Sequence, residues 1–182
     1  MGRNRTTAVV GAVPAAVIVG GTLSAAQATP PETQSAATLA AIEPGPGPRM
    51  RVITDNDYSG DPDGVVQLAH LLLSPSVDVR AVIGSHLAPG DPFDSSDQTA
   101  DNAVAKANEV IALAGRSDTS TAVAGSNVAL EDTTTPDDSA GAQAIIDEAL
   151  RADTTDPLYV VLGGGLTDLA SAYLERPRSP TV

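Results

Sequence analysis

Residues 49–84 read RMRVITDNDYSGDPDGVVQLAHLLLSPSVDVRAVIG, and this stretch decides the fold. Arg49–Thr54 is a short apolar run of the kind that forms a buried strand. Val65–Leu73 is strongly apolar and is predicted to be a helix that ends at Ser74-Pro75. Val77–Gly84 alternates and then becomes wholly apolar, which predicts a second buried strand. A strand, a helix and a strand in this order favour parallel pairing through a right-handed crossover.

The rest of the chain repeats this alternation. The patterns predict helices at Thr99–Ala114, Gly141–Ala152 and Thr167–Leu174, strands at Thr121–Ala124 and Leu158–Leu162, and a helix C-cap at Gly115. The predicted fold class is therefore α/β, with an open, mostly parallel, Rossmann-like sheet and helices on both faces. Residues 175–182 carry no further element where another strand and helix are expected, so we expect the sheet to be incomplete at the C-terminus.

The amino-terminal residues are typical of a secretory signal. Arg3 and Arg5 precede an apolar stretch, Ala8–Leu23, and Ala26-Gln27-Ala28 is a peptidase cleavage pattern. Pro14 and several glycines argue against a membrane anchor. We therefore expect a cleaved signal peptide and a secreted protein with no membrane partner after cleavage.

The following residues, 29–48, are rich in Pro, Ala, Thr and Gln and are predicted to form a disordered linker. The predicted folded domain spans residues 49–182. The 182-residue chain has 10 Lys and Arg against 23 Asp and Glu, a net charge of −13, which argues against a nucleic-acid partner. It has no Cys, so thiolate metal sites and a cysteine nucleophile are excluded.

An acidic loop follows the first predicted strand. Asp55, Asp57, Asp61 and Asp63 fall within nine residues. Carboxylates this close raise one another's pKa, and a divalent cation among their oxygens would relieve the repulsion. The carboxyl end of a strand in an open α/β sheet is also where ligands bind.

The residues alone leave several interpretations of this loop. It could be a solvated turn, since Asp, Gly, Ser and Pro are ordinary turn residues. An EF-hand loop is excluded, because Val66 stands at its twelfth position and a strand precedes it. A phosphatase with an Asp-x-Asp nucleophile fits the spacing of Asp55 and Asp57, but Lys106, the one lysine of the chain, is predicted to lie in the middle of a helix.

Three segments carry a resemblance to a known family. Residues 55–63, Asp-Asn-Asp-Tyr-Ser-Gly-Asp-Pro-Asp, resemble the signature Asp-x-Asp-Pro-Gly-x-Asp-Asp of the inosine-uridine-preferring nucleoside hydrolases. The last Asp of that signature falls on Pro62, and Asp63 stands one place later. Residues 79–86 and 158–170 are similar to a later strand of the family and to its strand, glycine turn and helix.

This resemblance implies a hydrolase that cleaves the N-glycosidic bond of purine or pyrimidine ribonucleosides with a Ca²⁺-bound water. It implies Asp57 as general base and metal ligand, Asp61 and Asp63 as further ligands, and the Gly163 carbonyl as another. Asp61 would also bind a ribose hydroxyl, and His86, in the loop after a strand, is a predicted substrate contact.

The expected cofactor is Ca²⁺ in preference to Mg²⁺, and the expected partner is a small-molecule nucleoside. The Asp and His that complete the family's site further along have no counterpart in this chain. An inactive form and a non-catalytic Ca²⁺- or sugar-binding module are therefore alternatives. The oligomeric state stays open, a homo-oligomer included.

Overall fold

The computed structural model describes Gly47 and residues 49–176. The predicted signal peptide (1–28), nearly all of the predicted linker (29–48) and residues 177–182 lie outside the described residues. Within the described part, no helix has both the length and the hydropathy needed to cross a bilayer.

Strands and helices alternate along the described chain, as the sequence predicts. The elements are β1 (Met50–Asn56), α2 (Asp63–Leu73), β2 (Val77–Gly84), α3 (Thr99–Leu113), β3 (Ala122–Ala124), α4 (Ala140–Ala149), β4 (Leu158–Leu162) and α5 (Thr167–Glu175). The strands form one parallel sheet in the order β3-β2-β1-β4. The predicted open α/β fold is confirmed.

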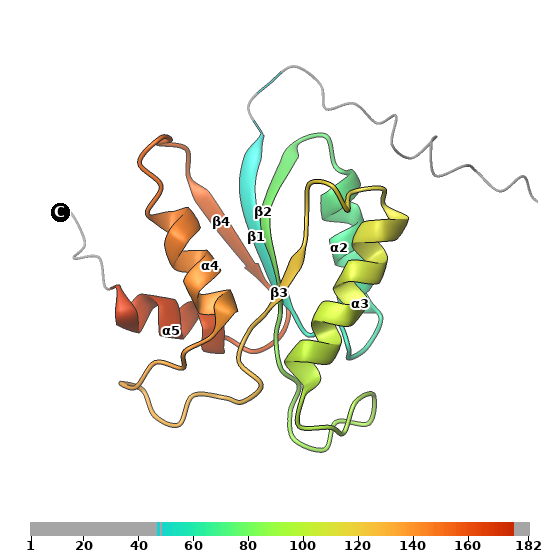
Figure 1. Cartoon of the computed structure of the whole chain (residues 1–182), viewed down its shortest axis with the longest axis vertical. Coiled ribbons are helices and arrows are strands. Elements are labelled where there is room, and N and C mark those ends of the chain that lie inside the picture. The colour runs from blue at the N-terminus through green and yellow to red at the C-terminus, as the bar shows by residue number, and fades with distance from the viewer. Residues whose placement is uncertain (1–46, 48, 177–182) are drawn as a thin grey trace, which may run out of the picture. The chain divides into compact units, whose positions relative to one another are not determined.

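Helices cover both faces of the sheet, with α2 and α3 on one side and α4 and α5 on the other (Figure 1). The sheet has a hydrophobic core on each face, and the adjacent β2 residues Val82 and Ile83 belong to different cores. Successive side chains of a strand point to opposite faces of the sheet. Val82 packs with the α2 and α3 cluster, which includes Leu68. Ile83 packs with the α4 and α5 cluster, which includes Ile53 and Ile145.

A buried ion pair joins the amino end of β1 to α4. Arg51 donates to Glu148 Oε1 from Nε at 3.0 Å and from a terminal nitrogen at 2.6 Å. It also donates to the carbonyl oxygens of Glu148 and Asp156. Arg80 and Arg151 contact the same carboxylate. Burial alone would raise the pKa of Glu148, but the hydrogen bonds from Arg51 and Arg80 outweigh it and lower that pKa.

The C-cap of α3 is Ala114, one residue before the predicted Gly115, and Gly115 follows it with a positive φ of 67°. Its N–H and that of Arg116 bond to carbonyl oxygens of the last helical turn. Since an L side chain is strained in this region, we expect Gly115→Ala to lower the free energy of unfolding by about 1 kcal/mol. Gly115→Asn, which tolerates the conformation better, is the matched control. Chemical denaturation checks the order, and an Ala variant as stable as wild type would contradict it.

Candidate functional site at the carboxyl edge of the sheet

Polar and glycine residues gather where the parallel strands end. Asp55 and Asn56 close β1, Ser85 follows β2, and the loops after β2 and β3 lie at this same end (Figure 1). The Gly163–Gly165 turn follows β4, which pairs with β1. The parallel register thus brings together the acidic loop and the glycine turn, which are remote in sequence.

The acidic loop is anchored by Tyr58. This side chain is 2% exposed, and its hydroxyl bonds to that of Thr54 at 3.0 Å. The Gly60 N–H closes the turn on the Asp57 carbonyl at 2.7 Å. Asp57 is half-buried, and its pKa is raised first by burial and then by the negative charges of Asp63 and Asp61, among others. A carboxylate with a raised pKa is better suited to accept a proton than a fully solvated one.

Asp61 and Asp63 lie in solvent at the rim of the site. The backbone N–H of Asp63 donates to Asp61 Oδ1 at 3.3 Å. A side-chain hydrogen bond between the two lowers the pKa of Asp61 and raises that of Asp63. As they lie, Asp57, Asp61 and Asp63 do not form a cage for a cation. Across Gly47 and residues 49–176, no cluster of three or more His, Asp or Glu side chains could hold a metal ion. The predicted Ca²⁺ ligand set stays a prediction.

The glycine turn lies against the end of β1 with no room for side chains. The Gly163 N–H donates to the Asp55 carbonyl at 3.0 Å, and a Cβ on Gly163 would collide with the Asn56 amide. A Cβ on Gly164 would stand 2.5 Å from Ser85 Oγ and 3.2 Å from Asp57 Cβ. Gly163 therefore lies beside the end of β1, and its role as a carbonyl ligand stays a prediction.

His86 lies at this edge, but both ring nitrogens have partners. Nδ1 is 3.1 Å from the Leu87 carbonyl, which can only accept, so Nδ1 carries the proton. Nε2 then accepts from the Thr167 hydroxyl at 3.0 Å. The predicted substrate contact through His86 would require Nε2 to exchange Thr167 for the substrate.

Asp55, Ser85 and Asp168 form a buried polar cluster that the sequence does not predict. The sequence places Asp55 in the acidic loop after a strand that ends at Thr54, but β1 continues to Asn56 and Asp55 is buried in it. The side chains are 0%, 1% and 0% exposed. Burial, followed by the charge of Asp168, raises the pKa of Asp55 to about 7. Ser85 lies beside Asp55 and partly offsets this rise. Burial also raises the pKa of Asp168, although hydrogen bonds from the Ser139 side chain and the Ser126 N–H lower it in part.

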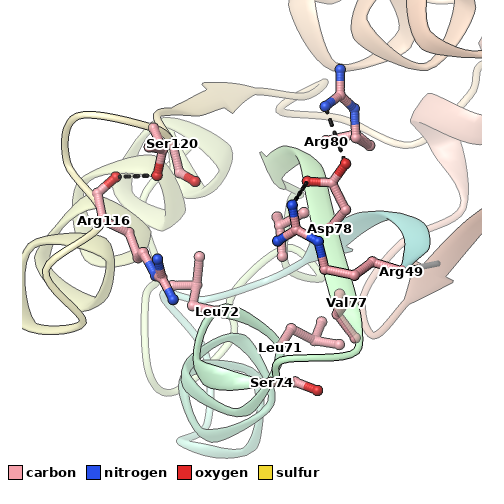
Figure 2. A pocket seen from close by; sticks show the side chains of 11 residues that line it. Arg49, Leu71, Leu72, Ser74, Val77, Asp78, Arg80, Arg116 and Ser120 are labelled. Carbon is pink, nitrogen blue, oxygen red and sulfur yellow. Dashed lines mark hydrogen bonds and ion pairs between the residues drawn. The ribbon is translucent and has the colours of Figure 1, made fainter. Parts of the chain in front are cut away.

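A separate pocket of about 390 Å³ opens at the opposite, amino edge of the sheet (Figure 2). Arg49, Arg80 and Arg116 are among its lining residues. Asp78 lies between the first two and contacts both, at 4.0 and 3.3 Å, so it offsets part of their charge. This pocket contains none of the predicted site residues.

Comparisons of the chain with protein-family models, with curated proteins and with solved structures find no match. The resemblance to nucleoside hydrolases therefore stays a hypothesis that depends on the residues themselves.

Proposed function

We propose that this chain is a hydrolase that cleaves the N-glycosidic bond of ribonucleosides at the carboxyl edge of its sheet. The observation that carries the proposal is the proximity of Asp57 to the Gly163–Gly165 turn. A Cβ at Gly164 would stand only 3.2 Å from the Cβ of Asp57. The resemblance assigns these two segments to one site, and the strand order places them side by side.

The chemistry assigns Asp57 the role of general base. The reaction passes through a positively charged ribosyl centre that a water attacks, and Asp57 would take the proton of that water. Burial and neighbouring carboxylates raise the pKa of Asp57, which brings its basicity closer to that task. The same carboxylates would stabilise the developing positive charge of the sugar. The exposed carboxylate of Asp61 would accept a hydrogen bond from a ribose hydroxyl.

The test is release of base from inosine and from uridine by the full chain, with Ca²⁺ or Mg²⁺ present. We expect turnover, and we expect Asp57→Asn to reduce it about a hundredfold because the amide cannot accept the proton. Asp118→Asn is the matched control, since this exposed carboxylate precedes β3 at the opposite edge and should leave turnover unchanged.

Full activity in Asp57→Asn would refute the assignment of the base. No release of base from either nucleoside, by folded protein with the ions present, would refute the hydrolase and leave the binding-module alternative.

A further inference from the structure

We propose that the buried cluster Asp55, Ser85 and Asp168 is a binding site for one divalent cation, Ca²⁺ or Mg²⁺. This site differs from the ligand set Asp57, Asp61, Asp63 and Gly163 that the resemblance implies, and the inference does not depend on the proposed hydrolase activity.

The first argument is the distribution of unpaired atoms. Four buried side-chain oxygens in the described part of the chain lack a hydrogen-bond partner with good geometry: both carboxylate oxygens of Asp55, Ser85 Oγ and Asp168 Oδ2. Ser85 lies close enough to Asp55 for its hydroxyl to lower the pKa of that carboxyl by a hydrogen bond. A hydroxyl has one proton to donate, so at least one oxygen of Asp55 and Asp168 Oδ2 still lack a partner. Buried polar atoms in folded proteins nearly always have partners, so one missing partner common to these oxygens explains them best.

The second argument is that the backbone directs these side chains to one place. Ile53 and Ile83 pack in the core between the sheet and α4 and α5. Asp55 and Ser85 follow them by two residues, so they point to the same face of the sheet. Asp168, in the first turn of α5, lies over that face. Its charge is the largest electrostatic influence on Asp55.

Asp168 is also held in a fixed orientation. Its Oδ1 accepts from the Ser126 N–H at 3.0 Å and from Ser139 Oγ at 2.5 Å, which leaves Oδ2 without a partner. A Cβ on Gly125 would collide with this carboxylate, so glycine is required for the close packing around it. Fixed ligand orientation is the role that outer hydrogen bonds have around a metal.

The third argument is charge. At the opposite edge, the buried Glu148 receives Arg51 and Arg80 as partners. At this edge two buried carboxylates lie together, and the charges that act on Asp55 are those of Asp168 and Asp57, both negative. Burial of carboxylates without a counter-charge is unfavourable, so a cation from solution would stabilise the cluster. Carboxylate and hydroxyl oxygens are ligands that hard ions such as Ca²⁺ and Mg²⁺ prefer.

The test uses the full chain, stripped with EDTA and titrated with CaCl₂ or MgCl₂ at neutral pH. We expect saturable binding of one ion in calorimetry and a rise of the melting temperature that depends on ion concentration. In Asp55→Asn and in Asp168→Asn we expect the affinity to fall about a hundredfold. The control is Asp118→Asn, an exposed carboxylate at the opposite edge, which should bind as wild type does. The double variant Asp61→Asn/Asp63→Asn separates this site from the acidic loop.

The two proposals fail separately. Absence of saturable binding by either ion would overturn the cation site, and so would unchanged affinity in Asp55→Asn and Asp168→Asn. If the double variant of the rim loses binding and the buried variants keep it, the ion sits in the acidic loop, and the site proposed here is wrong. If one buried variant fails to fold, the other decides. Base release from nucleosides is measured independently of these outcomes.

Discussion

Arg51→Met lowers the free energy of unfolding by about 3 kcal/mol, because it removes the principal partner of a buried carboxylate. Arg51 and Glu148 have side chains that are each 10% exposed. The change also leaves the carbonyl oxygens of Glu148 and Asp156 without their donor. Arg80 remains 3.0 Å from Glu148 Oε1, which keeps the loss at the lower end of the range for broken buried pairs. Urea unfolding, followed by circular dichroism, measures the loss.

Arg151→Met is the matched control for this prediction. Arg151 contacts the same carboxylate from 3.4 Å, but its side chain is 31% exposed and its shorter contact, at 2.6 Å, is with the exposed Asp153. We expect a loss below about 1 kcal/mol. The double variant Arg51→Met/Glu148→Leu should be more stable than Arg51→Met alone, because the carboxylate left short of a partner is gone. Equal losses for the two single variants would show that burial of the Arg51 pair adds nothing.

The architecture could be predicted from the sequence because its signals are local. Hydrophobic period, Gly and Pro locate every described helix and strand, and Val77–Gly84 and Leu158–Leu162 are found with their predicted bounds. The largest error is at the end of α4, predicted at Ala152 and observed at Ala149. Arg151 instead forms a local ion pair with Asp153. The periodic spacing of hydrophobic residues does not reveal a local ion pair of this kind.

The site could be predicted only in part, because its polar contacts join remote segments. The density of Asp57, Asp61 and Asp63 is visible in the sequence, but their exposure is not. Asp55 and Asp168 form the buried carboxylate pair, and the helix and strand patterns alone do not reveal that α5 places one over the other. The predicted strand ends at Thr54, but β1 continues to Asn56, so Asp55 lies in the buried strand; a carboxylate directly after the apolar run was the available signal. Arg51 in the same strand is a similar signal for the ion pair with Glu148.

The cation-free protein loses about 3 kcal/mol of stability as the pH rises from 4.5 to 7.5, through Asp55 alone. Its pKa is about 7 in the folded state against 3.8 for an unperturbed Asp, with burial as the main cause. The folded state therefore holds this proton more tightly than the unfolded state. The resulting stability is complete below the unfolded pKa and is lost as the pH rises through the folded pKa.

Asp55→Asn isolates this contribution, since the amide does not titrate. In EDTA the variant should lack this part of the pH dependence and should be more stable than wild type at pH 7.5. Carboxylates with lowered pKa, such as Asp132 and Asp153 at about 2, lose their contribution at lower pH and do not obscure this window. Urea unfolding at several pH values measures how the free energy of unfolding of each protein depends on pH. Parallel curves for the two proteins would contradict the raised pKa of Asp55. A wild-type curve that flattens when Ca²⁺ is added would indicate that the ion replaces the proton on Asp55.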